Sequence, residues 1–184
     1  LIGVGMQSLL YIRYVPFSSF AEAGIDTAKG TFRYWGSVVY FFYIIFTCIM
    51  TDTLAYFVGV FFGKHKMNPR VSPKKTWEGF AFGVAGTIAI DLAVLFSLAA
   101  TGTPILPCLD MAHWYRLVIL SVLMPLFGTL GDLAFSLVKR GENLKDFGKI
   151  IPGHGGILDR IDSHLFASLG TMIVLSFFMH GWLF

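Results

Sequence analysis

The segment 79–101, GFAFGVAGTIAIDLAVLFSLAAT, decides the fold class of this chain. It contains one charged residue, Asp91, and it is long enough to cross a hydrocarbon layer, which needs about 20 residues of helix. The segment 1–12 is also apolar but too short to cross alone. Three further segments are, like 79–101, apolar and long enough to cross the membrane: 34–63, 114–138 and 162–184. The sequence therefore predicts an all-α, polytopic bundle of transmembrane helices.

The composition agrees with a protein whose solvent is mostly lipid. Of the 184 residues 55% are hydrophobic and 14% are charged, whereas a soluble domain has roughly 25% charged residues. This balance excludes a disordered chain. The two cysteines, Cys48 and Cys108, provide neither a disulfide framework nor a CxxC metal spacing. We expect a single transmembrane domain over 1–184, the C-terminal part of a longer chain, because the sequence opens at an apolar Leu1.

The basic residues indicate which ends of the helices share a side. Ten of the 14 Lys and Arg residues lie in or beside 64–75 and 139–160, whereas the connection 102–113 has none. By the positive-inside rule both basic stretches face the cytoplasm and 102–113 faces outward. The same reasoning places 13–33 outside, despite its own basic residues.

The first basic stretch has features that a topology signal does not need. In RVSPKKTWEG, residues 70–79, Pro73 stiffens the backbone, paired lysines follow, and Glu78 suits the positive end of the next helix dipole. Such a stretch is suited to hold phosphates at the membrane surface. The alternative is a stop signal or an anchor for anionic lipid.

The second basic stretch is SLVKRGENLKDFGKIIPGHGGILDR, residues 136–160. Its glycines permit the close backbone approaches that an anion-binding loop needs, and His154 stands between two of them. Acids alternate with the bases here, unlike in a plain lipid anchor. Carboxylates among phosphate-binding cations make sense if they hold a divalent metal that the phosphates also bind.

Three carboxylates are the candidate metal ligands. Asp132 lies in an apolar span about 10 Å of helix below Lys139, at roughly 1.5 Å per residue, so it is shallow enough to reach the interface. Asp159 and Asp162 have i, i+3 spacing at the start of the last helix and can share one ion. The alternative is that these two residues only cap the helix start.

Two further acids inside the spans have open roles, since a carboxylate in a span is costly and suggests function. Asp52 either joins the site or accepts hydrogen bonds inside the bundle. The long span 34–63 must tilt, bend or project beyond the bilayer, and Asp52 is the expected place of an irregularity. Asp91 marks a proton or ion pathway, or a buried helix contact. Four glycines are expected to allow close helix packing: Gly83, Gly86, Gly128 and Gly131.

Together these residues resemble the signature of the phosphatidate cytidylyltransferases, also called CDP-diacylglycerol synthases. The resemblance rests on four consecutive motifs: Ser136-x-x-Lys139-Arg140, Lys145-Asp146-x-Gly148, Pro152-Gly153-His154-Gly155-Gly156 and Asp159-Arg160-x-Asp162. Two upstream segments also look like those of the family: Asp52-Thr53-x-Ala55-Tyr56-x-x-Gly59 and Ser72-Pro73-Lys74-Lys75-Thr76-x-Glu78-Gly79.

The resemblance implies a single catalytic domain that transfers CMP from CTP to phosphatidic acid, giving CDP-diacylglycerol and pyrophosphate. It implies a homodimer that depends on Mg²⁺, and less firmly a second ion, K⁺. The family's metal ligands fall on Asp132, Asp159 and Asp162. Residues expected to be catalytic are Asp132, Lys139, Arg140, His154 and Arg160. Residues expected to bind substrate are Ser72, Lys74, Lys75, Ser136, Lys145, Gly153, Gly155 and Gly156.

The expected location is a multi-pass membrane protein with its active site at the cytoplasmic interface, in the inner membrane if the source is bacterial. Membrane lipid is an expected partner and nucleic acid is not. Three alternatives compete with this interpretation. A CDP-alcohol phosphotransferase would need a DGxxAR motif, which the sequence lacks. A transporter would use Asp52, Asp91 and Asp132 for protons or cations, and a scaffold would only bind anionic lipid.

Overall fold

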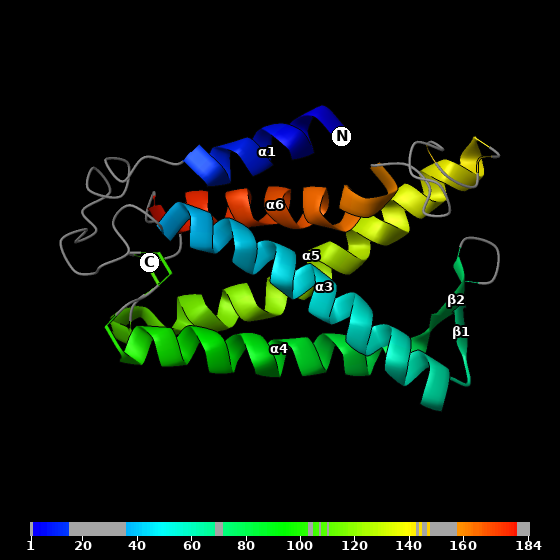
Figure 1. Cartoon of the computed structure of the whole chain (residues 1–184), viewed down its shortest axis with the longest axis horizontal. Coiled ribbons are helices and arrows are strands. Elements are labelled where there is room, and N and C mark those ends of the chain that lie inside the picture. Colours follow the sequence, from blue (N-terminus) through cyan, green and yellow to red (C-terminus); the bar gives the residue numbers. More distant parts are fainter. Residues whose placement is uncertain are drawn as a thin grey trace.

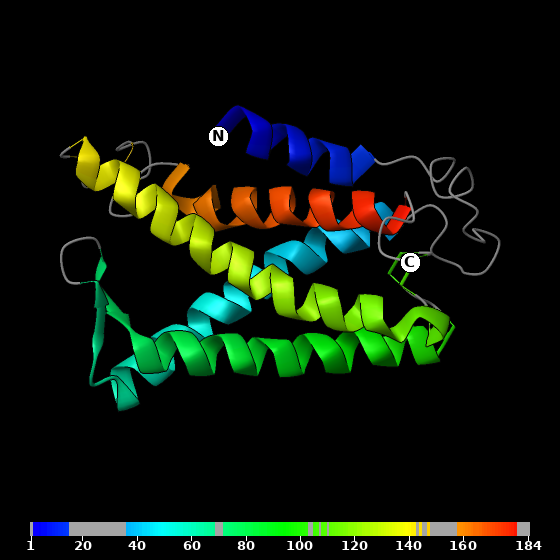
Figure 2. The same cartoon turned by 180° about the vertical axis from the view of Figure 1, so that it is seen from behind.

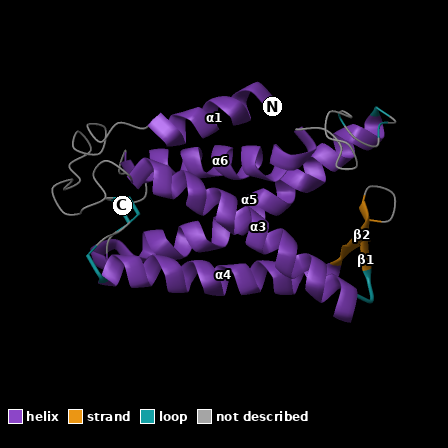
Figure 3. Ribbon diagram, viewed as in Figure 1, coloured by secondary structure: helices purple, strands orange, loops and turns teal. Residues whose placement is uncertain are grey.

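The computed structural model describes residues 2–14, 36–68, 72–102, 105–106, 108–109, 111–142, 144, 147 and 158–179. Within them the chain forms a helix bundle with one small hairpin (Figure 1, Figure 3). The elements are α1 (Ile2–Tyr14), α3 (Gly36–Phe62), β1 (Lys66–Asn68), β2 (Ser72–Thr76), α4 (Trp77–Ala100), η2 (Met111–His113), α5 (Trp114–Gly141) and α6 (Leu158–Met179).

Four of the described helices are long and apolar enough to cross a membrane, which confirms the predicted helical bundle. Their spanning segments are Val38–Phe62, Trp77–Ala100, Met111–Gly141 and Ile161–Phe178. The last helix begins at Leu158, four residues before the predicted start, and residues 180–184 lie outside the described residues. The short apolar segment at the start of the chain forms α1, which packs alongside α6.

Helix α3 shows no irregularity at Asp52, the place where one was expected. Helix α3 runs as one α-helix of 27 residues, about 40 Å at roughly 1.5 Å per residue, whereas the hydrocarbon layer is about 30 Å thick. Viewed from either side, α3 crosses α4 and α6 diagonally (Figure 1, Figure 2). The diagonal course of α3 agrees with tilt, one of the three expected ways to accommodate the extra length, and α3 remains one uninterrupted helix.

The connection between α3 and α4 contains an antiparallel hairpin, which the purely helical prediction missed. Strands β1 and β2 pair with Lys66 opposite Thr76 and Asn68 opposite Ser72. Helix α4 starts directly after the hairpin at Trp77, two residues before the predicted start. Thr76 caps α4, because its Oγ1 accepts a hydrogen bond from the Gly79 N–H at 3.1 Å.

The four glycines expected at helix contacts all lie against a neighbouring helix. A Cβ added to Gly83 would lie 2.7 Å from the Ala55 Cβ, and one added to Gly131 would collide with the Phe166 side chain. Added Cβ atoms at Gly86 and Gly128 would meet Leu54 and Cys48 at 3.1 Å and 3.3 Å. The prediction of close packing at these positions is confirmed.

The two ends of the bundle differ in charge. The hairpin, the C-terminal end of α5 and the start of α6 lie together at one end, and the end of α4 and the start of α5 lie at the other (Figure 1, Figure 2). The described parts of both basic stretches therefore share one end, as the charge pattern predicts. We call this the basic end of the bundle.

Candidate active site

A cavity of about 260 Å³ lies at the basic end, between α3, α4, α5 and the hairpin. Its charged lining residues are Asp52 from α3, Lys75 from β2 and Asp132 from α5. The cavity thus joins carboxylates carried by membrane-spanning helices to a cation carried by the hairpin. The complete lining is Thr51, Asp52, Ala55, Tyr56, Met67, Ser72, Lys75, Thr76, Phe80, Thr129 and Asp132.

Local structure explains why Lys75 reaches into the bundle. The hairpin is tied to the start of α4, because the Trp77 N–H donates to the His65 carbonyl at 3.0 Å. The same turn is held by His65, whose Nδ1 lies 2.6 Å from Glu78 Oε1. These contacts fix the end of β2 beside the helices, so that the residue before the Thr76 cap can extend toward α5.

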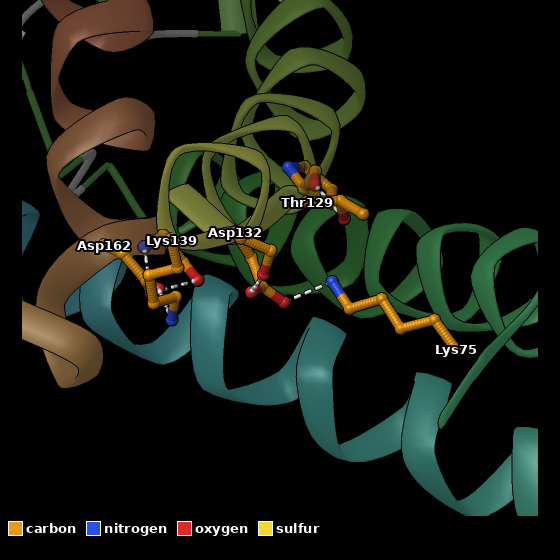
Figure 4. A network of polar contacts seen from close by, with 8 residues as sticks. Lys75, Thr129, Asp132, Lys139 and Asp162 are labelled. Carbon is orange, nitrogen blue, oxygen red and sulfur yellow. Dashed lines mark hydrogen bonds and ion pairs between the residues drawn. The ribbon is translucent and has the colours of Figure 1, made fainter. Parts of the chain in front are cut away.

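The central interaction of the cavity is an ion pair between Lys75 and Asp132. The Lys75 ammonium contacts Asp132 Oδ2 (Figure 4). The other carboxylate oxygen, Oδ1, accepts a hydrogen bond from Ser136 Oγ at 3.4 Å, one helical turn along α5. Both oxygens of Asp132 therefore face donors of this chain.

A second charged pair lies beside the first. Lys139 Nζ of α5 is 3.9 Å from Asp162 Oδ2 of α6, and both side chains are mostly buried (Figure 4). Asp162 Oδ1 accepts the Ser163 N–H at 2.7 Å. Asp162 lies inside α6, after its first turn, so the alternative that it caps the helix start is wrong.

The carboxylates of three helices interact electrostatically at this end of the bundle. Asp132 and Asp162 repel one another, and both repel Asp52. Carboxylate oxygens are the ligands that Mg²⁺ prefers, and a divalent cation would relieve this repulsion. The chemistry of the donors therefore fits the expected metal.

The complete metal site stays a prediction. Among the described residues, no group of three or more His, Cys, Asp and Glu side chains lies close enough to hold a metal ion. The side chain of the third expected ligand, Asp159, lies outside the described residues. The structure brings Asp132 and Asp162 to the same end of the bundle, on α5 and α6.

The other predicted site residues divide into two groups. Ser72 lines the cavity, Ser136 binds Asp132, and Arg140 is exposed, donating to the Leu144 carbonyl at 3.1 Å. The remaining ones lie outside the described residues, wholly or in their side chains: Lys74, Lys145, Gly153, His154, Gly155, Gly156 and Arg160.

Several cavity residues were not predicted from the sequence. Thr129 lies one turn before Asp132 on α5, and Tyr56 lies one turn after Asp52 on α3. Helical spacing of three or four residues from each acid was the available signal, because such residues share a helix face. Met67 and Phe80 had no such signal, since the fold of the hairpin brings them to the cavity.

The structure decides between the open roles of the two other acids. Asp52 lines the cavity and therefore joins the candidate site. Asp91 is fully buried in the contact between α3 and α4, where it accepts hydrogen bonds from Thr47 Oγ1. Asp91 does not line the cavity, so a buried helix contact describes it.

Comparison with known proteins shows where this chain belongs. The model of the cytidylyltransferase family matches residues 3–178. The chain belongs to the cytidylyltransferase family. As a family member it is similar to the phosphatidate cytidylyltransferase of Bacillus subtilis, with 45% identity over 139 residues, which are 74% of this chain and 48% of that protein.

Two more members of the cytidylyltransferase family show the same similarity. The phosphatidate cytidylyltransferase of Staphylococcus saprophyticus is 42% identical over 67% of this chain and 45% of its own length. That of Mycobacterium tuberculosis is 41% identical over 73% of this chain and 38% of its own length. The chain thus spans about half the length or less of these relatives. The family match includes every residue that lines the cavity.

Proposed function

We propose that the protein containing this chain transfers CMP from CTP to phosphatidic acid, giving CDP-diacylglycerol and pyrophosphate. The observation that carries the proposal is the cavity in which the hairpin cation Lys75 meets Asp132 of a spanning helix. A lipid phosphate and a water-soluble nucleotide need such a boundary between apolar helices and a polar surface. The names of the relatives support the same reaction.

The reaction needs positioning more than a strong base. An anionic oxygen of the phosphatidate monoester forms a bond to the α-phosphorus of CTP, and the bond from that phosphorus to the bridging oxygen breaks, releasing pyrophosphate. The main obstacle is repulsion between two anionic groups. Lys75 and Lys139 supply positive charge at the described part of the site, and Ser72 offers a hydroxyl in the cavity.

Asp132, Asp159 and Asp162 are the residues proposed to hold Mg²⁺. The ion would neutralise phosphate oxygens as charge shifts during transfer. Lys74, Lys145, His154 and Arg160 are proposed to bind phosphates, together with Arg140 and the glycines Gly153, Gly155 and Gly156. A second ion, K⁺, and a homodimer belong to the proposal through the family resemblance alone.

The basic end is proposed to face the cytoplasm in a multi-pass membrane protein. The described parts of both basic stretches lie at that end, which agrees with the positive-inside rule. The nucleotide would then arrive from the cytoplasm while the acyl chains stay in the bilayer.

The test is transfer of label from α-labelled CTP into lipid by the purified protein in detergent with phosphatidate. We expect Mg²⁺-dependent CDP-diacylglycerol, and a loss of at least about a hundredfold in Asp132→Asn, comparable to removal of one preorganised charge-stabilising group. Asp91→Asn removes an equally membrane-embedded charge outside the cavity and is the matched control. Activity that survives in Asp132→Asn refutes the metal assignment. A folded protein that labels no lipid refutes the function and favours the transporter.

A further inference from the structure

The ammonium group of Lys75 is incompletely bound. Its nitrogen is buried, and within the described residues it has no hydrogen-bond partner besides its ion pair with Asp132. An ammonium carries three N–H donors. Donors that remain unused beside a cavity of about 260 Å³ are available to an anion that enters it.

Lys75 pairs with a carboxylate oxygen of Asp132, the residue proposed as a metal ligand. Lys75 occupies Oδ2 of Asp132, and Ser136 donates to Oδ1. A divalent cation bound to Oδ2 would lie next to the ammonium, and two cations at one carboxylate oxygen repel strongly inside a protein. The ammonium and a metal ion therefore compete for Asp132.

The lysine has room to leave. Its side chain is 26% exposed, and a lysine carries its point charge on a flexible stem with three rotatable donors. Ser72 of the same strand lines the same cavity and offers a hydroxyl to an anion there. Because Lys75 itself lines the cavity, a rotation of its side chain would carry the ammonium from Asp132 toward an anion bound there.

We propose that Lys75 is an exchangeable counter-ion, which occupies the metal position at Asp132 in the free protein and transfers to a substrate phosphate when the metal binds. The inference rests on the proposed function and deepens it. Metal binding frees Lys75 to bind phosphate, and phosphate binding removes the competitor of the metal. By linkage, each ligand then strengthens the binding of the other by the same factor.

The experiment measures Mn²⁺ affinity by electron paramagnetic resonance, on the purified protein in detergent. Lys75→Met removes the competing cation, and Lys66→Met removes a cation from the neighbouring strand of the hairpin, outside the cavity. We expect Lys75→Met to bind Mn²⁺ at least about fivefold more tightly than wild type without substrate, a typical coupling magnitude. We expect Lys66→Met to bind it like wild type.

Two further arms identify the phosphate that receives the lysine. Mn²⁺ affinity is measured again with CTP or with a short-chain phosphatidate, at equal concentrations for all variants. The substrate whose phosphate binds Lys75 should tighten Mn²⁺ binding in wild type and in Lys66→Met, and should lose this effect in Lys75→Met. Equal tightening by a substrate in all three proteins shows that its phosphate is not the receiver.

The inference is wrong if Lys75→Met binds Mn²⁺ no more tightly than wild type, if Lys66→Met has the same effect, or if wild type binds no Mn²⁺ at all. It is also wrong if CTP and phosphatidate each change the Mn²⁺ affinity of Lys75→Met as much as they change that of wild type and Lys66→Met. Lys75→Gln replaces Lys75→Met if the latter does not fold. The label-transfer assay on wild type judges the proposed function separately, because Mn²⁺ exchange at Asp132 is measured without turnover.

Discussion

Thr47 of α3 donates its hydroxyl hydrogen to the Asp91 carboxylate of α4, with Oγ1 at 3.1 Å and 3.2 Å from the two oxygens. Both residues are fully buried. The bond joins α3 and α4, and the burial of both side chains shields it from solvent. The structure therefore gives Asp91 a packing role, away from the charged cavity at the basic end.

This relationship predicts that Thr47→Val destabilises the protein. The change keeps the side-chain shape but removes the donor, and an unsatisfied buried polar group costs about 1–3 kcal/mol. Asp91→Asn retains an acceptor for Thr47 and should unfold close to wild type. Thermal unfolding in detergent measures both. A folded Asp91→Asn protein without transfer activity would contradict the packing role and restore an ion pathway.

Asp52 should behave differently from Asp91, although both are carboxylates inside spans. It lines the cavity and interacts electrostatically with Lys75 and Asp132. We expect Asp52→Asn to lower kcat/KM at least about tenfold, or about 1.4 kcal/mol of transition-state stabilisation, with an unchanged melting temperature. Steady-state transfer kinetics beside Asp91→Asn test this. Equal kinetics in the two variants would remove Asp52 from the site.

The contact between α5 and α6 should tolerate no side chain at Gly131. A Cβ there would collide with the Phe166 side chain and lie 3.2 Å from the Asp162 carbonyl oxygen. We expect Gly131→Ala to cost about 1–3 kcal/mol, as overpacking does, and to lower activity because it separates the helices that carry Asp132 and Asp162.

Gly141 provides the matched control at the end of the same helix. An added Cβ at that position meets nothing within 4 Å. Gly141→Ala should therefore unfold at or above the wild-type temperature, since alanine favours a helix by about 1 kcal/mol over glycine. Equal destabilisation in both variants would show that loss of glycine, and not the contact with α6, is responsible.

Much of the fold can be predicted from the sequence, because the residues within each segment determine whether that segment forms a spanning helix. A continuous apolar run must satisfy its own backbone hydrogen bonds in lipid, so the four spanning helices follow from their length and composition. The hairpin between α3 and α4 could not be predicted from the sequence by the same reasoning. Its strands are short, with Lys66 and Thr76 as paired positions, and no clear alternation of apolar and polar residues marks them.

The site was partly predicted, because the types of individual residues are visible in the sequence whereas their contacts are not. Asp132 and Asp162 stand out as acids in apolar helices, and Lys75 stands out in a basic stretch with proline. Their positions in the chain do not reveal which cation meets which carboxylate. Met67 and Phe80 carry no mark of function in the sequence, and only the fold brings them to the cavity.

The sequence by itself indicated a membrane environment, the four long apolar helices, the basic end of the bundle and the family signature. Each of these depends on the types of residue in particular segments of the chain. Only the tertiary structure decided that Lys75 pairs with Asp132 and that Asp52 and Asp91 have different surroundings. The physical reason is that these contacts depend on the crossing of α3, α4 and α5. Packing between side chains of distant segments sets that crossing, as where Gly83 lies against Ala55.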